Sequence, residues 1–316
     1  MGKTGPAVGN GRVKWTGYGD YDKFYQAMTP SPYRLVITDI DGTLLDDEGN
    51  LPALNLSALR HCKAMGVHTC LATGRRWTTC VRLLDRLELK GLIDFCILNN
   101  GMLVRDVARD RLLNRRDFPF PLFLQAVERL NAASLDPIVL GHNPDGKTAD
   151  VFHRRDALMN GDFIAKNTGH ARRVGDWREL DGAHLVELVL IGRKGDLQAA
   201  AESLAGLDLE VVILRNTFYK EYMLEITPKG ISKLLGANEL LGHLGLTSAQ
   251  AIAIGDSDND YALLRDFPMS IAVANAEPRV LAVAKEITGL NSEGGFGQSV
   301  FRHIPGPAAC GPLATR

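Results

Sequence analysis

The chain has 316 residues, of which 45% are hydrophobic, enough for one sizeable core and a second smaller one. Its 36 basic and 37 acidic residues nearly cancel, so no overall field favours nucleic acid or an acidic membrane. The five cysteines show neither CxxC pairs nor Cys/His ligand spacing, which argues against structural zinc and a disulfide framework. The chain also lacks an apolar signal core and any apolar run near the ~18 residues that span a bilayer, so we expect a cytoplasmic protein.

Strand and helix patterns alternate in the outer parts of the chain. The short apolar runs expected to be buried strands are 35–38, 67–72, 95–98, 251–254 and 270–274. Helical spacing separates the first three of them, over 54–62 and again over 77–89. This alternation predicts an α/β fold with a doubly wound, Rossmann-like parallel sheet that carries helices on both faces.

The middle of the chain follows another pattern. Amphipathic helices are expected around 123–130 and 197–204, and strands around 185–191 and 211–214. We interpret this part as an inserted α+β cap domain. The expected division is an N-terminal arm at 1–32, a core at 33–100 and 217–303, the cap at 101–216, and a flexible C-terminal tail at 304–316.

Two carboxylates, Asp39 and Asp41, follow the first predicted strand directly and are separated by one residue. They would project into the crevice at the carboxyl edge of the sheet, where open α/β folds bind ligands. Close carboxylates repel each other unless a cation lies between them, and a hard divalent ion suits oxygen ligands. Gly42 lets the chain turn and brings backbone N–H groups toward an anion. The competing interpretation is a surface turn, because Asp-Gly is a common turn pair.

Thr73, Gly74 and Arg75 follow the second predicted strand. A hydroxyl at a strand end, followed by a helix N-terminus, can donate a hydrogen bond to a phosphate oxygen, and Arg75 adds a second anion contact. An ordinary N-cap role for Thr73 explains the same pattern.

Lys233 lies in the expected first turn of a helix, where a cation opposes the helix dipole and an anionic partner would offset the cost. Lys229 competes for this role, and an exposed lysine is the simpler alternative.

Three acids, Asp256, Asp258 and Asp260, follow the predicted strand at 251–254. They can supply a metal ligand and a further acid that orients bound water. A calcium loop also alternates acids, but it needs a Gly and a Glu at later positions that this segment lacks. All four segments fall at strand-to-helix junctions, which a parallel sheet gathers at one edge.

The four segments resemble the motifs of haloacid-dehalogenase-superfamily phosphatases, specifically those of the Cof-type subfamily. Residues 39–44, 73–75, Lys233 and 255–260 match the first to fourth motifs in order. Residues 100–101 are similar to the point where such proteins leave the core for a C2 cap. The resemblance covers roughly 33–303, with specific motifs only in the outer domain.

The resemblance implies a role for each motif residue. Asp39 would be the nucleophile that forms an aspartyl-phosphate, and Asp41 would protonate the leaving group and later activate water. Thr73 and Lys233 would bind the transferring phosphoryl group.

The resemblance also implies a cofactor and further contacts. Asp39, Asp256 and the backbone carbonyl of Asp41 would hold Mg²⁺, with Asp260 in support. Phosphate or substrate contacts are implied for Gly42, Gly74, Arg75, Asn100 and Asn259.

We therefore expect a Mg²⁺-dependent phosphatase acting on a small phosphorylated metabolite, such as a sugar phosphate. A phosphomutase and a non-catalytic binding protein on the same fold are the alternatives. The cap would exclude water and contact the part of the substrate that does not react. We expect no nucleic-acid or membrane partner, and the sequence is compatible with a homo-oligomer.

Overall fold

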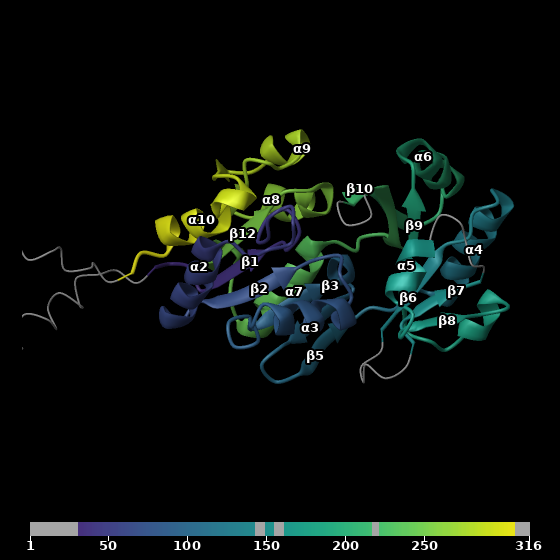
Figure 1. Cartoon of the computed structure of the whole chain (residues 1–316), viewed down its shortest axis with the longest axis horizontal. Helices are drawn as coiled ribbons and strands as arrows, with labels where there is room; N and C mark the ends of the chain where they lie inside the picture. The colour runs from purple at the N-terminus through teal and green to yellow at the C-terminus, as the bar shows by residue number, and fades with distance from the viewer. Residues whose placement is uncertain (1–30, 143–148, 155–160, 217–220, 307–316) are drawn as a thin grey trace, which may run out of the picture.

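The computed structural model of the protein describes residues 31–142, 149–154, 161–216 and 221–306. The expected N-terminal arm and C-terminal tail lie almost entirely outside these ranges. The described residues form two lobes, each built around one β-sheet (Figure 1). None of the helices within these ranges has the length and apolar character that a bilayer crossing requires.

The larger lobe contains an eight-stranded sheet in the order β14-β13-β12-β1-β2-β3-β4-β5. Its strands are β1 (Leu35–Thr38), β2 (His68–Ala72), β3 (Phe95–Leu98), β4 (Leu103–Asp106), β5 (Arg111–Arg115), β12 (Ala251–Gly255), β13 (Met269–Ala272) and β14 (Glu286–Ile287). All neighbours from β14 to β3 pair in parallel, whereas β4 and β5 extend the sheet as antiparallel strands. The five strands expected from the apolar runs are present, within two residues of their expected bounds at each end.

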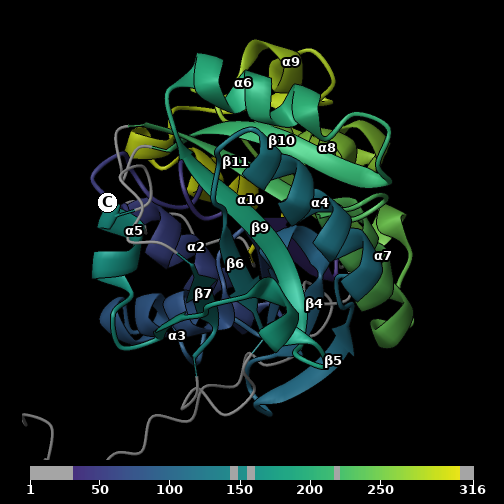
Figure 2. The ribbon, with the colours of Figure 1, turned by 90° about the vertical axis from the view of Figure 1, so that its right-hand side faces the viewer.

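Helices cover both faces of this sheet, with α2 and α3 on one side and α7 and α8 on the other (Figure 2). The helices of this lobe are α2 (Ala53–Ala64), α3 (Trp77–Arg86), α7 (Lys233–Leu244), α8 (Tyr261–Asp266), α9 (Pro278–Leu281) and α10 (Gly295–His303). Short 3₁₀ turns are η1 (Asn99–Gly101), η3 (Ser248–Gln250), η4 (Asp258–Asp260) and η5 (Asn291–Glu293). The α/β fold expected from the alternation of strands and helices is thus confirmed.

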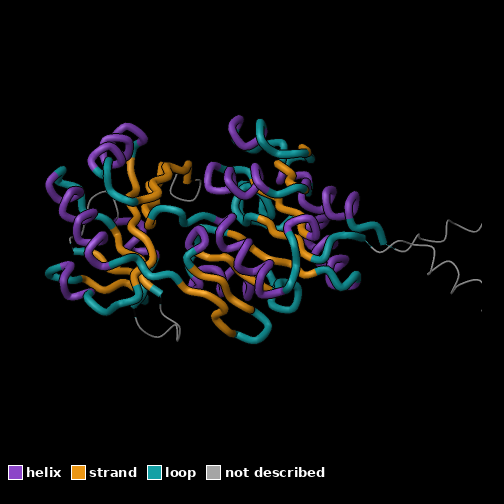
Figure 3. The backbone as a smooth tube through the Cα atoms, turned by 180° about the vertical axis from the view of Figure 1, so that it is seen from behind, coloured by secondary structure: helices purple, strands orange, loops and turns teal. Residues whose placement is uncertain are grey.

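The smaller lobe contains a six-stranded sheet in the order β10-β11-β9-β6-β7-β8. Its strands are β6 (Ile138–Gly141), β7 (Val151–His153), β8 (Ala171–Arg173), β9 (Leu185–Gly192), β10 (Leu209–Asn216) and β11 (Glu221–Pro228). Its helical elements are α4 (Phe120–Ala132), α5 (Gly161–Lys166), η2 (Trp177–Leu180) and α6 (Lys194–Ser203). The view from behind shows that both lobes combine strands with helices (Figure 3). The smaller lobe is called the cap below.

The range of the cap sheet differs from the expected cap at 101–216. Strands β4 and β5 continue the core sheet as an antiparallel extension, so the chain enters the cap only after Arg115. Strand β11 pairs with β9 and β10, so the cap sheet continues to Pro228. The sequence does not show where the chain passes from the core sheet to the cap sheet and back. A short strand has the same periodicity in either sheet.

The cap sheet has two differently covered faces. Alternate residues Leu188 and Leu190 of β9, with Leu224 of β11, pack in a cluster with α4 and α6. Val189 and Ile191, on the opposite face of β9, belong to the cluster that contains the core of the larger lobe. Because side chains alternate along a strand, one face of the cap sheet lies toward the core lobe.

Candidate active site

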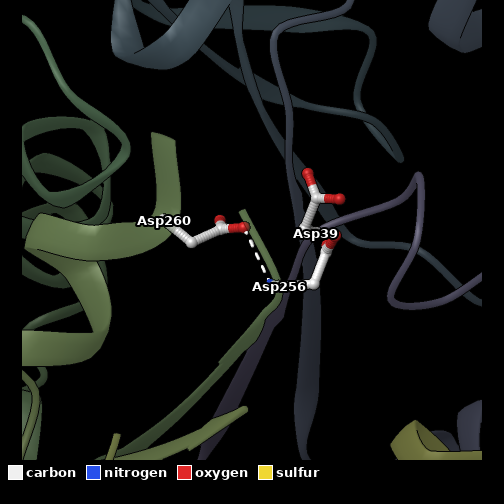
Figure 4. A group of neighbouring side chains, drawn as sticks. All are labelled: Asp39, Asp256 and Asp260. Atoms are coloured by element: carbon white, nitrogen blue, oxygen red, sulfur yellow. Dashed lines mark hydrogen bonds between the residues drawn. The ribbon is translucent and has the colours of Figure 1, made fainter. Parts of the chain in front are cut away.

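Asp39 lies immediately after β1, the strand between β12 and β2. Its backbone N–H donates to the Ile254 carbonyl at 3.0 Å and continues the pairing of β1 with β12. The Asp39 side chain therefore lies at the carboxyl ends of the central strands, and the residue is only 5% exposed. Figure 4 shows its carboxylate near those of Asp256 and Asp260.

Lys233 begins α7 and is fully buried beneath this carboxylate group. Its Nζ donates to Asp39 Oδ1 at 2.6 Å and to Asp260 Oδ1 at 2.8 Å. Burial alone would lower the pKa of the Lys233 ammonium, but the charges of Asp260 and Asp39 raise it above its usual value. Lys233 is thus a permanent cation with anionic partners, as its position at a helix N-terminus requires. Lys229, its competitor, lies outside α7 and is exposed.

Asp256 follows β12 and faces the turn after Asp39. Its Oδ1 accepts a hydrogen bond from Thr43 Oγ1 at 2.6 Å. A Cβ atom on Gly42 would lie 2.5 Å from Asp256 Oδ2, and Gly42 has a φ of +86°, a conformation that favours glycine. Only glycine therefore allows the first motif to lie this close to the Asp256 carboxylate. Asp258, the remaining acid of this segment, pairs with Arg279 at 3.5 Å and does not belong to the carboxylate group of Asp39, Asp256 and Asp260.

The donor set fits a divalent cation with oxygen ligands. One carboxylate oxygen from each of Asp39, Asp256 and Asp260 lies within 4.8 Å of the others. Asp260 Oδ2 also accepts from the backbone N–H groups of Asp256 and Ser257 at 3.1 and 3.2 Å, so Asp260 is held by the protein itself. Burial, together with neighbouring charges, raises the pKa of Asp256 well above its usual value. A bound cation would favour the ionised forms of these acids.

Metal binding should therefore depend on pH. Burial raises the pKa of Asp39 to about 7, despite the opposing effect of Lys233. Below that pH the carboxyl group holds a proton, which a metal ion must displace. We expect Mg²⁺ affinity to increase with pH by at least about tenfold per unit below about pH 7, because the ion must displace the proton of Asp39 and any proton held by Asp256. Titration calorimetry across this range checks this prediction, and an affinity independent of pH would contradict it.

Thr73 and Arg75 lie at the end of β2, beside Asp41. Arg75 forms a bidentate pair with Asp41, with Nε–Oδ2 and Nη2–Oδ1 distances of 2.7 and 2.6 Å. The Thr73 hydroxyl accepts from the Arg75 backbone N–H at 3.1 Å. Helix α3 begins later, with Arg76 as its N-cap, so an N-cap role of Thr73 for α3 is wrong. A phosphate contact by Thr73, Gly74 or Arg75 stays a prediction.

Asn100 connects the motif loops to the cap. It adopts a left-handed backbone conformation with φ 54°, and its Oδ1 accepts from Asn259 Nδ2 at 3.1 Å. Its Nδ2 donates to two cap carboxylates, Glu225 and, at 3.3 Å, Glu187. Asn99 Nδ2 also donates to Glu187, at 3.1 Å.

Glu187 and Glu225 are not among the site residues predicted from the sequence. One signal could have found them, because each places a charged residue directly between apolar residues of a strand. Both are almost completely buried, where a carboxylate requires hydrogen-bond donors.

The sequence matches a family model described as haloacid dehalogenase-like hydrolase over residues 36–300. Among curated relatives, a 5-amino-6-(5-phospho-D-ribitylamino)uracil phosphatase of Bacillus subtilis is 27% identical over 271 residues, covering 85% of this chain and 96% of the relative. An HMP-PP phosphatase of Yersinia pestis is 29% identical over 252 residues, covering 78% of this chain and 86% of the relative.

A solved phosphatase of the same superfamily, from Bacteroides thetaiotaomicron, superimposes with a TM-score of 0.71 at 19% identity. The match covers 88% of this chain and 98% of that structure, and it supports the fold. The family match includes β1, β12 and all four motif segments. This chain therefore belongs to the haloacid dehalogenase-like hydrolases and is an enzyme of the phosphatase type represented by these relatives.

Proposed function

We propose that the protein is a Mg²⁺-dependent phosphatase that hydrolyses a small phosphorylated metabolite through an aspartyl-phosphate on Asp39. The observation that carries the proposal is the position of Asp39, buried at the sheet edge with Lys233 on one oxygen and Asp256 nearby. Phosphoryl transfer requires a carboxylate close to a cation and to further acids that can hold a metal ion. A fold does not require such a buried group of charged residues for its stability.

In the first step, the free oxygen of Asp39 attacks phosphorus, and the bond to the substrate alcohol breaks. Lys233 offsets the repulsion between the carboxylate and the phosphate dianion, and Thr73 lies at the neighbouring strand end to hold a phosphoryl oxygen. Mg²⁺, held by Asp39, Asp256 and the Asp41 carbonyl with Asp260 in support, would neutralise charge on the transferring group.

Asp41 serves both steps in this proposal. It gives a proton to the departing alkoxide and then takes a proton from the water that hydrolyses the aspartyl-phosphate. The Asp41 side chain is 48% exposed, so substrate and water can reach it. Both Asp41 oxygens accept from Arg75 in the structure, so we expect Arg75 to release one of them before Asp41 takes up the proton that it gives to the alkoxide.

The substrate belongs to the small phosphorylated metabolites. The two curated relatives are named for different compounds, a phosphoribitylamino-uracil and HMP-PP, so kinship alone does not select one. A cytoplasmic location, the absence of a nucleic-acid partner and the oligomeric state stay predictions from the sequence.

The test is phosphate release from a panel of phosphorylated metabolites, with Mg²⁺ and with EDTA. We expect release with Mg²⁺, its loss in EDTA and its recovery when Mg²⁺ is added in excess. Activity that is indifferent to both would remove the metal from the mechanism. If no member releases phosphate but a bisphosphate activator allows the phosphoryl group to return to substrate, the enzyme is a phosphomutase instead.

A further inference from the structure

Two cap carboxylates lie directly over the phosphate-binding loops of the core. Glu187 on β9 and Glu225 on β11 share the face of the cap sheet that lies toward the core lobe, because their neighbours Leu188 and Leu224 pack on the other face. Both contact Asn100, which in turn accepts from Asn259 of the fourth motif. They are therefore part of the surface that faces a bound phosphate ester.

Glu225 also approaches the second motif. A Cβ atom on Gly74 would lie 2.9 Å from Glu225 Oε1, and Gly74 directly follows the proposed phosphate ligand Thr73. Burial raises the pKa of the Glu225 carboxyl group above its usual value, while the hydrogen bond from Asn100 and the charge of Lys233 act in the opposite direction. The Glu225 carboxylate therefore lies against the loop that carries Thr73, within the electrostatic reach of Lys233.

The hydrogen-bonding capacity and charge of Glu187 and Glu225 limit the kinds of group that can lie against them. Within the described ranges, the hydrogen-bond donors to Glu187 and Glu225 are the neutral amides of Asn99 and Asn100, and the positive charge of Arg76 also acts on Glu187. Burial and the proximity of Glu225 raise the pKa of Glu187 well above its usual value. Each carboxylate has more lone pairs than the amides use, so both can accept further hydrogen bonds. Hydroxyl or amino groups would satisfy them. A second anion would be repelled as long as one of the two carboxyl groups is ionised, which the charges of Arg76 and Lys233 favour.

We propose that Glu187 and Glu225 determine which leaving group the enzyme accepts: an alcohol that carries hydroxyl or amino groups and no second anionic group. The inference rests on the proposed phosphatase function and adds its substrate class. The apolar neighbours Val189 and Met223 on the same face would contact the carbon chain of such a polyol or amino alcohol.

Three substrates of equal carbon number test the class with the wild-type enzyme: sorbitol monophosphate, hexyl phosphate and hexanediol bisphosphate. We expect kcat/KM to be highest for sorbitol monophosphate, at least about tenfold lower for hexyl phosphate, and about 100-fold lower for the bisphosphate. Equal or faster turnover of the bisphosphate would overturn the inference.

Variants of Glu187 and Glu225 test whether these two residues cause the preference among the three substrates. In Glu225→Gln and Glu187→Gln, we expect kcat/KM for sorbitol monophosphate to fall about 10- to 100-fold, because charge-assisted hydrogen bonds are lost. Turnover of the bisphosphate should rise. The matched control is Glu202→Gln, an exposed position on α6 that should leave all rates unchanged.

Para-nitrophenyl phosphate separates the two possible failures, because its leaving group carries no hydroxyl or amino donor. In the glutamine variants we expect kcat/KM to fall less for this compound than for sorbitol monophosphate. If the wild type shows no Mg²⁺-dependent release from this compound or from sorbitol monophosphate, the proposed function fails, and the inference fails with it. If the compound is hydrolysed but both variants slow all substrates equally, only the inference fails.

Discussion

Replacing Asp39 with Asn should abolish turnover while leaving the fold intact. An amide is a poor nucleophile and a weaker metal ligand than a carboxylate, so we expect kcat to fall by at least about a thousandfold. The change preserves shape and removes a charge whose burial is unfavourable, as the pKa of about 7 indicates. Lys233 keeps its second partner, Asp260, at 2.8 Å, so its ammonium does not become an unpaired buried charge.

Phosphate release and thermal unfolding, measured side by side, check this prediction. The control is Asp208→Asn, the same chemical change at an exposed position in the loop before β10, which should affect neither quantity. Turnover near the wild-type rate in Asp39→Asn would show that another group attacks phosphorus. Loss of the folded state would instead assign Asp39 a structural role that its geometry does not suggest.

The sequence predicts the core motifs well because their positions follow from one simple rule. Parallel strands bring their carboxyl ends to the same edge, so Asp39 after β1 and Asp256 after β12 must lie close together once both strands are recognised. The strands are short, apolar and β-branched, which makes them recognisable. Gly42 adds a local signal, because the close approach of Asp256 tolerates no side chain there.

The roles of Glu187 and Glu225 depend on a different kind of information. Their significance arises only when the cap docks on the core and places them against Asn100, which lies 87 and 125 positions away in the chain. No local pattern specifies that pairing, since the spacing of residues within a strand says nothing about which surface it will contact. The bounds of the cap are hidden for the same reason, because β4 and β5 resemble cap strands until their partners are known.

Arg75 shows the same limit within a recognised motif. Its sequence context indicates an anion contact, and the structure pairs it with Asp41, an anion of the protein itself. Whether an arginine contacts a ligand or a carboxylate depends on which is nearer in three dimensions, and the motif is compatible with both.

The largest expected effect on stability comes from a buried ion pair that joins the two lobes. Arg76, at the start of α3 in the core, donates to Asp150 and Asn167 of the cap. Thr78 Oγ1 donates to the second Asp150 oxygen at 2.8 Å, and both charged residues are almost completely buried. This group fixes the position of the cap relative to the core, and with it the position of Glu187 and Glu225 over the motif loops.

Asp150→Leu should lower the free energy of unfolding by about 3–5 kcal/mol, because it removes the buried carboxylate that accepts hydrogen bonds from the Arg76 guanidinium and from Thr78. Arg76→Met should cost a similar amount, since it leaves Asp150 uncompensated. The double variant Arg76→Met/Asp150→Leu removes both charges, and we expect it to be less destabilised than either single variant. Urea unfolding of the four proteins measures this coupling.

Strict additivity of the two single effects would show that the pair does not act as a unit, and the position of the cap would then depend on its other contacts with the core. The opposite result is energetic coupling between Arg76 and Asp150, together with a lower kcat/KM for sorbitol monophosphate and normal hydrolysis of para-nitrophenyl phosphate. This result would connect the stability of the cap position to the choice of leaving group. The reason is geometric: a loosened cap moves Glu187 and Glu225 away from the leaving group but leaves Asp39, Lys233 and Asp256 in the core. The core thus carries the chemical step and the cap selects the leaving group, and the Arg76–Asp150 pair is one of the contacts that align the two lobes.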